Sequence, residues 1–236
     1  MSTNRRRFLQ GATMGAAAFS VPGAFAETLR RTAVMGDGPY YPDRLPLDTD
    51  NDLLIINDQA TPAVGEIAHF GGRVLGETGE PIRNAFVEIW QSDVNGSYIH
   101  TQGRYEGKLD SNFQGYGRFL TDSQGRYYFR TIKPVPYTLQ GTFRAPHIHV
   151  AVSKAGKRLM ATQALVKGHE ANARDSIIAR VRDPAALETL MVEFRPIPGS
   201  GLGELAGDFD IVLGRTAQEL EDGSIGGIGA PEPFGA

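Results

Sequence analysis

Short apolar and alternating runs dominate the chain from residue 66 onward. They predict strands at residues 67–75, 85–90, 127–131, 147–152, 159–166 and 208–213. Clusters of Gly, Pro, Asp and Ser, which favour turns, separate these runs. Strands of this length and spacing predict an all-β fold whose core is an antiparallel β-sandwich.

The segments around this core show other patterns. Short helices are expected at residues 176–181 and 184–190, the second opened by Pro184. Residues 27–65, rich in Pro, Asp and turn signals, predict an N-terminal arm that wraps the core. The β-sandwich domain is then expected over residues 66–215, followed by an irregular tail at 216–236 that is rich in Gly and Pro.

Residues 1–26 predict an export signal. Arg5-Arg6-Arg7-Phe8-Leu9 precedes a small apolar stretch over residues 11–21, and Ala24-Phe25-Ala26 is an A-x-A cleavage pattern. The apolar stretch is too short to span a membrane. An ordinary signal peptide is the alternative, but the complete R-R-x-F-L string favours the twin-arginine type, which carries folded chains. We therefore expect export to the periplasm, with a mature protein that begins near Glu27.

Composition narrows the choice of partners and metals. The chain has 236 residues, a net charge of -3 and no cysteine. Because no strongly basic face is implied, nucleic acid is not expected as a partner. Without cysteine, no disulfide can form and no metal can be held by thiolates. Any metal must therefore use imidazole, phenol, carboxylate, amide or backbone groups.

The strongest chemical signal is the pair His147 and His149. Residues two apart in a strand point to the same face, so both imidazoles project together while Ile148 faces the other layer. An isolated H-x-H is more often a solvated strand face, and Tyr98 and Tyr137, taken singly, are more often packing residues. Taken together, two neutral imidazoles and two phenolates form a coherent set for trivalent iron, whose charge stabilises the phenolate form.

Several separated motifs resemble those of the intradiol ring-cleavage dioxygenases, in particular the subunits of protocatechuate 3,4-dioxygenases. The matching stretches are Gly38-Pro39-Tyr40-Tyr41-Pro42, Val87-Glu88-Ile89-Trp90-Gln91, Gly103-Arg104-Tyr105, Leu120-Thr121-Asp122, Arg130-Thr131-Ile132-Lys133-Pro134, Tyr137, Arg144-Ala145-Pro146-His147-Ile148-His149 and Thr162-Gln163. They extend over roughly residues 36–215 in the family's order. That order is far more specific than any single motif.

The resemblance implies a role for each matching residue. Tyr98, Tyr137, His147 and His149 would bind one non-haem Fe(III) per chain, and Tyr137 would leave the iron when substrate binds and take a proton. Arg144 would stabilise negative charge that develops on the substrate ring, with Gln163 beside it. Tyr40 and Trp90 match residues that line or approach the substrate pocket.

The implied reaction is an oxidation by O2. A catechol-type ring is cleaved between its two hydroxylated carbons, both oxygen atoms are incorporated, and a cis,cis-muconate-type diacid results, as in the catabolism of aromatic compounds. The ring substituent, the need for a second type of subunit and the oligomeric state, a homo-oligomer included, stay open at this stage.

The competing hypothesis is a secreted, non-catalytic β-sandwich binding module. The segment from Gly72 to Tyr137 has the Gly-x-Val start and the Asp-x-x-Gly-x-Tyr hairpin of such domains. A binding module needs no array of two tyrosines and two histidines, so this array discriminates between the two hypotheses. A hydrolase is disfavoured because the sequence contains neither a serine nucleophile elbow nor H-E-x-x-H.

Overall fold

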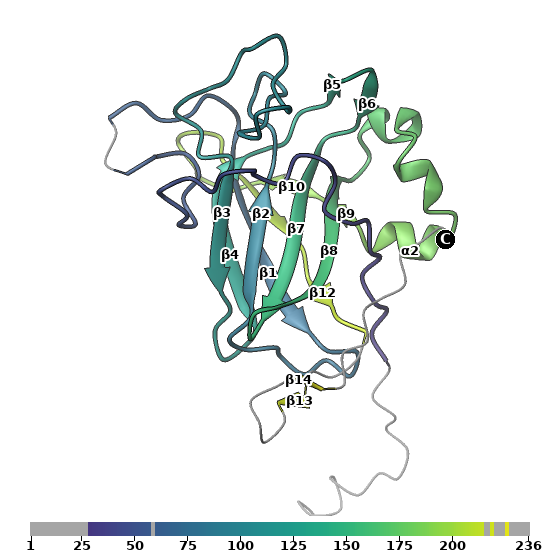
Figure 1. Ribbon diagram of the computed structural model, residues 1–236. Helices are drawn as coiled ribbons and strands as arrows, with labels where there is room; N and C mark the ends of the chain where they lie inside the picture. The colour runs from purple at the N-terminus through teal and green to yellow at the C-terminus, as the bar shows by residue number, and fades with distance from the viewer. Residues whose placement is uncertain (1–27, 58–59, 215–217, 220–224, 227–236) are drawn as a thin grey trace, which may run out of the picture.

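Two five-stranded sheets face each other at the centre of the molecule (Figure 1). One sheet contains β10 (Phe194–Pro196), β11 (Leu205–Asp208), β1 (Ile67–Leu75), β12 (Ile211–Val212) and β4 (Arg126–Ile132). The other has the order β3 (Tyr116–Leu120), β2 (Phe86–Trp90), β7 (His147–Lys154), β8 (Lys157–Val166) and β9 (Met191–Val192). This computed structural model describes residues 28–57, 60–214, 218–219 and 225–226.

The hydrophobic core lies between the two sheets. Phe70 and Phe129 from one sheet pack with Ile89, Ile148 and Val150 from the other, and all are fully buried. Burial of these side chains removes apolar surface from water, and each Å² removed stabilises the fold by about 25 cal/mol. The predicted all-β fold is confirmed.

The sheets are mixed, although the strand pattern led us to expect an antiparallel sandwich. Most pairs are antiparallel, but β1 pairs in parallel with β11 and with β12, and β8 pairs in parallel with β9. A parallel pair needs a long connection between its strands: residues 76–204 connect β1 to β11, and residues 167–190, which include the helical elements, connect β8 to β9. Side-chain alternation is the same in both kinds of pair, so the sequence pattern does not reveal strand direction.

Several short elements differ from the prediction. The expected strand at 208–213 is divided between the end of β11 and β12, and β3, β5 (Tyr137–Leu139), β6 (Thr142–Arg144), β9 and β10 were not predicted. The helical elements are η1 (Glu170–Arg174), η2 (Ile178–Arg180) and α2 (Pro184–Glu188). In the tail expected to be irregular, β13 (Gln218–Glu219) and β14 (Ile225–Gly226) form an antiparallel pair. The predicted export signal lies outside the described residues.

The N-terminal arm is attached to both sheets. Its backbone donates hydrogen bonds from Thr32 N to Val212 O at 3.1 Å, from Met35 N to Ala161 O at 3.2 Å and from Leu53 N to Arg130 O at 2.8 Å. In Figure 1 this segment crosses in front of β7 and β8. The arm therefore covers one end of the β3-β2-β7-β8-β9 sheet.

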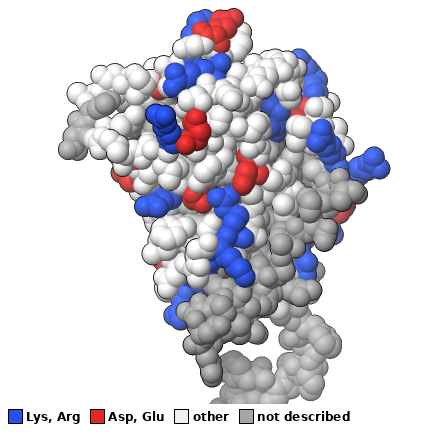
Figure 2. Space-filling model, in the orientation of Figure 1, with Lys and Arg blue, Asp and Glu red and all other residues white. Residues whose placement is uncertain are grey.

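Acidic and basic side chains are interspersed on the face shown in Figure 2, over a surface that is mainly uncharged. Across the described ranges, no helix is both long and apolar enough to cross a membrane.

Candidate metal centre

One row of residues across the β3-β2-β7-β8-β9 sheet forms a wall of the site. Trp90 of β2 lies opposite His149 of β7, which lies opposite Gln163 of β8. Residues directly opposite each other share a face of the sheet. Because Ile148 belongs to the core between the sheets, this row faces away from that core, toward the arm and the loops.

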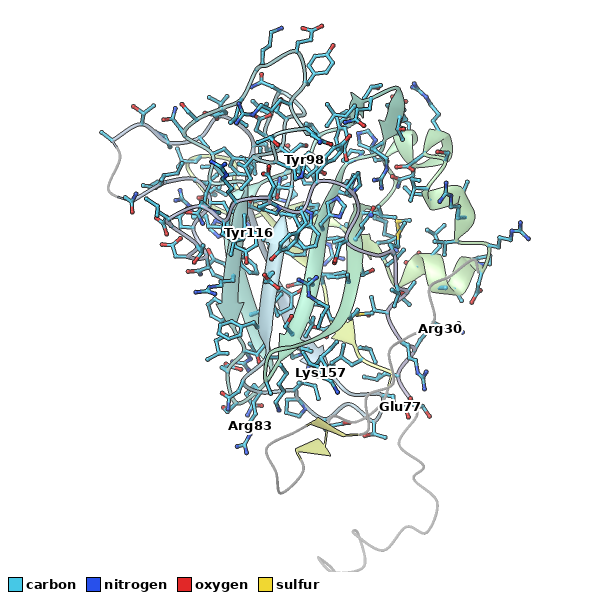
Figure 3. All side chains as sticks on the ribbon, viewed as in Figure 1. Arg30, Glu77, Arg83, Tyr98, Tyr116 and Lys157 are labelled. Atoms are coloured by element: carbon cyan, nitrogen blue, oxygen red, sulfur yellow. The ribbon has the colours of Figure 1, made fainter. Side chains whose placement is uncertain are left out.

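The two tyrosines come from segments outside the sheet. Tyr98 follows a turn in which the Asp93 carboxylate accepts hydrogen bonds from Asn95 N at 2.8 Å and Ser97 N at 2.9 Å. Figure 3 shows Tyr98 among the loops at the upper end of the front sheet. Tyr137 opens the β5–β6 hairpin, where it lies opposite Arg144. These two segments fold over the row on the sheet and close the site.

The predicted ligand atoms converge on one buried point. The Oη atoms of Tyr98 and Tyr137 are 3.0 Å apart. Each of them lies 3.4 Å from Nε2 of His147. The Nε2 atoms of His147 and His149 are 3.1 Å apart. Two phenol oxygens and two imidazole nitrogens thus face a common centre.

The two imidazoles are oriented by different contacts. Nδ1 of His147 lies 2.6 Å from the carbonyl oxygen of Ala145, so Nδ1–H donates there and the Nε2 lone pair faces the phenols. His149 stacks on Trp90, with ring centroids 4.9 Å apart and planes 7° apart. Its Nδ1 is buried without a hydrogen-bond partner. Packing therefore holds this second ring.

Three glycines lie directly against the ligand side chains. A Cβ atom at Gly38 would come within 2.9 Å of the His149 ring, at Gly96 within 2.7 Å of Tyr137 Cβ, and at Gly103 within 2.8 Å of Tyr98 Cβ. Distances this short are not tolerated between carbon atoms, so any larger residue would push the ring out of place. Bare backbone at these positions lets the rings pack closely.

Burial keeps all four groups neutral in the absence of a cation. Desolvation raises the pKa of Tyr137 to about 12 and raises the pKa of Tyr98 well above its usual value. Desolvation likewise lowers the pKa of His147 to about 3 and lowers that of His149 well below its usual range. A bound cation would displace the protons of the two phenols. Its ligands would then be two anionic oxygens and two neutral nitrogens.

This donor set fits a hard trivalent ion. Phenolate and imidazole ligands suit iron, and no softer thiolate is present in the sequence. Elsewhere in the part of the chain that the structure describes, no group of three or more His, Cys, Asp or Glu could hold a metal ion. Tyr98, Tyr137, His147 and His149 therefore form the candidate metal centre.

Arg144 is fixed beside this centre. Its Nε donates to Oδ2 of Asp175 at 3.0 Å, and its Nη2 donates to Oε1 of Gln163. Its charge acts to lower the pKa of Tyr137, although burial of that phenol outweighs it. A guanidinium held in this way can stabilise a negative charge on a molecule bound next to Tyr137.

Tyr40 of the arm completes the wall, with its ring centroid 5.2 Å from that of Tyr98. Tyr40, Tyr137 and Arg144 retain 6–7% exposure, whereas Trp90 and His149 have none. Among the described residues of the site, Tyr40, Tyr137 and Arg144 therefore mark its more exposed side.

Comparison with known proteins gives the family. A family model described as "Dioxygenase" (Dioxygenase_C) matches residues 36–214. The chain is 38% identical over 178 residues to the protocatechuate 3,4-dioxygenase beta chain of Burkholderia cepacia, a match that covers 73% of this chain and 75% of that one. The chain belongs to the intradiol ring-cleavage dioxygenases. This intradiol dioxygenase is accordingly an oxidoreductase.

More distant relatives of the dioxygenase share the fold. Catechol 1,2-dioxygenase 2 of Acinetobacter lwoffii is 32% identical over 146 residues, which cover 56% of this chain and 50% of that one. The solved structure of 3-chlorocatechol 1,2-dioxygenase from Rhodococcus opacus 1CP superposes with a TM-score of 0.60 at 21% identity, covering 87% of this chain and 78% of that one.

The structure brings together every site residue predicted for the dioxygenase from its sequence. They are Tyr40, Trp90, Tyr98, Tyr137, Arg144, His147, His149 and Gln163. Sequence reasoning missed Asp175 and the three glycines. A single Asp before an expected helix at 176–181 indicates a helix cap, and nothing in the sequence connects it with Arg144.

Proposed function

We propose that this dioxygenase binds a non-haem Fe(III) ion and uses O2 to open a catechol-type ring between its two hydroxylated carbons, giving a cis,cis-muconate-type diacid. The observation that carries the proposal is the convergence of two phenol oxygens and two imidazole nitrogens, in which Nε2 of His147 lies 3.1–3.4 Å from each of the other three atoms and the phenol oxygens lie 3.0 Å apart. The relatives named above act, by their names, on protocatechuate, catechol and a chlorocatechol. All three are catechols, which supports this substrate class.

The ligand residues divide into two pairs by their surroundings. Tyr98, Tyr137, His147 and His149 would hold the iron, which when bound would make a catecholate ring reactive toward O2. Tyr98 is wholly buried, whereas Tyr137 lies beside the opening of the site with 7% exposure. Burial raises the pKa of the Tyr137 phenol to about 12 in the metal-free protein, so its phenolate, once free of the metal, would be a strong base. Its Oη is therefore the group suited to take the proton of a substrate hydroxyl.

The remaining residues orient the ring and keep the site dry. Arg144 places a fixed positive charge where negative charge develops on the substrate, and Gln163 holds one of its nitrogens. Tyr40 and Trp90 bound the site with flat apolar surfaces. Exclusion of water makes the guanidinium charge count for more than it would in solution.

The test is oxygen uptake by the iron-loaded protein with a panel of catechols: catechol, protocatechuate, hydroxyquinol and a chlorocatechol. We expect uptake with at least one of them, and with ¹⁸O₂ a ring-opened diacid that contains both labelled atoms. The iron-loaded protein should also be red-brown, from charge transfer between tyrosinate and Fe(III). A product cleaved outside the diol would refute the proposal.

A matched pair of variants tests the ligand set. Tyr98→Phe should lose iron, colour and turnover together. Tyr116→Phe is the control, because this buried hydroxyl donates to Glu88 Oε1 at 2.6 Å, away from the four converging atoms. It should keep all three properties. A wild-type protein that stays colourless and binds no iron on reconstitution would instead favour the non-catalytic binding module.

A further inference from the structure

Asp175 is a buried carboxylate between η1 and η2 that touches none of the proposed ligands. Its Oδ2 accepts hydrogen bonds from Arg144 Nε at 3.0 Å and from Ala145 N at 2.8 Å. Its Oδ1 accepts from Ile177 N at 2.8 Å and from Ile178 N at 3.2 Å. Its side chain has 0% exposure and that of Arg144 has 7%. Both oxygens are thus committed to donors, as a buried carboxylate requires.

The contacts of Asp175 reach both functional halves of the site. Arg144 presents its guanidinium to the substrate side, where Nη2 donates to Gln163. The next residue, Ala145, is held through its amide by Asp175, while its carbonyl oxygen, 2.6 Å from His147 Nδ1, fixes the orientation of that imidazole. One carboxylate therefore holds a cation in position and, through the backbone of the single residue Ala145, influences the direction of a proposed metal-binding nitrogen.

The Ile177 and Ile178 amides on Oδ1 anchor Asp175 independently of the site. The backbone at the start of η2 holds Oδ1 and thereby the whole carboxylate. Oδ2 is therefore an acceptor whose position does not depend on Arg144. The arrangement fits an anchor outside the site for the 144–147 segment.

We propose that Asp175 is the positioning residue that holds Arg144 against the substrate and His147 toward the metal. The inference rests on the proposed function. Asp175→Asn keeps the size of the side chain but replaces one acceptor oxygen with an NH₂ group. This group faces either Arg144 Nε and Ala145 N or the amides of Ile177 and Ile178, which are donors themselves. The guanidinium and the Ala145 carbonyl should then shift together. Removal of a partner that orients a ligand typically costs about 10–100-fold in metal affinity or activity.

The experiment compares Asp175→Asn, Arg144→Gln and Asp183→Asn. Asp183 is the matched control, because it caps α2 by accepting from Ala185 N at 3.0 Å and lies 3.5 Å from Arg30, with both side chains at least half exposed. The readouts are iron affinity by chelator competition, the energy of the tyrosinate-to-iron band, kcat and KM for catechol, and thermal unfolding of the iron-free protein.

Asp175→Asn should lower iron affinity and kcat by about 10–100-fold each and shift the band. Arg144→Gln should lower kcat but leave iron affinity and the band near wild type. Asp183→Asn should change thermal stability only. An Asp175→Asn protein whose iron affinity, band and kcat match wild type, with only its unfolding temperature lowered, would overturn the proposal and leave Asp175 as a structural cap.

Failure of the role proposed for Asp175 can be distinguished from failure of the proposed function. If Asp175→Asn does not fold, Asp175→Glu retains the charge and moves the carboxylate by one methylene. Iron affinity and kcat should both fall in this variant as well, and wild-type values would again overturn the proposal. If wild-type protein neither binds iron nor consumes oxygen with any catechol, the proposed function itself fails.

Discussion

At the scale of single residues, His147 and His149 show that two equivalent positions in a sequence can be fixed by different forces. The first imidazole is held by a hydrogen bond to Ala145 O at 2.6 Å, and the second by the stacked ring of Trp90. The hydrogen bond determines which nitrogen of His147 carries the proton. Stacking of His149 fixes only the plane of the ring. The lone pair on Nε2 of His147 therefore has a better defined direction than the one on Nε2 of His149.

Burial of these histidines makes the iron-free protein sensitive to acid. The usual pKa of 6.5 is lowered to about 3 in folded His147, so between these values the unfolded chain binds a proton that the folded chain does not. Unfolding is therefore favoured as the pH falls below about 6.5. From pH 7 to pH 5, His147 alone should lower the free energy of unfolding by about 2 kcal/mol.

Urea denaturation of iron-free protein at pH 7 and pH 5 measures this effect. The decrease should be smaller in His147→Asn, which lacks the titrating ring. Equal urea midpoints at both pH values in the wild type would contradict the prediction.

Residue types and order were enough to predict the components of the site, but not the contacts that orient them. The H-x-H spacing places His147 and His149 on one face of a strand. That Trp90 and Gln163 flank His149 follows from strand register, which depends on residues far apart in the chain. The role of Asp175 depends on a contact with Arg144 that only the tertiary structure creates.

At the scale of elements, β7 divides its residues between the core and the site. Ile148 and Val150 face the other sheet, whereas His147 and His149 face the arm and loops. A shift of one residue in register would exchange these two sets. The buried apolar residues of β7 thus hold the histidines in place by fixing the register.

Substitutions on the two faces of β7 and its neighbour should therefore have separable effects. Ile148→Val removes one methylene from the core and should cost about 1 kcal/mol of stability with no change in iron affinity. Trp90→Leu, which removes the ring stacked on His149, should weaken iron binding. Denaturation and chelator competition measure the two quantities. A tenfold loss of iron affinity in Ile148→Val would show that the faces are not independent.

The missed strand β3 shows why some elements escape prediction. Its sequence contains Gly117 and Arg118, neither typical of a strand interior. A Cβ atom at Gly117 would lie 2.6 Å from Asp50 O of the arm, so this glycine is needed where the arm crosses the sheet. The requirement comes from a segment distant in sequence, which local propensity does not include.

At the scale of the whole molecule, the arm links the start of the described chain to the site. Gly38 lies against the His149 ring and Tyr40 against Tyr98, while Met35 and Leu53 are bonded to opposite sheets. The site is therefore complete only when the arm and both sheets have folded together. For the iron binding proposed above, transport in the folded state would be an advantage, because the site would be complete before export.

We propose on these grounds that residues 1–26 direct export by the twin-arginine pathway. Replacement of both Arg5 and Arg6 by lysine should leave unprocessed protein in the cytoplasm, as measured by cell fractionation and the mass of the intact chain. The control replaces Arg30 and Arg31 by lysine. This second arginine pair lies in the mature segment, where it is paired with Asp183 and Glu77. Unchanged export after the first replacement would contradict the proposal.

The parallel pairing of β1 with β11 and β12 also affects how the chain folds. β1 is synthesised early, but the strands that cover one of its edges come from the far end of the described sandwich. Contacts so distant in sequence form slowly, because a long loop must lose conformational entropy before the contacts can stabilise the chain. Until then β1 presents unpaired backbone groups that can join another chain. Folding of the sandwich must therefore finish after almost the entire chain has left the ribosome, and protection of β1 from aggregation matters most in that interval.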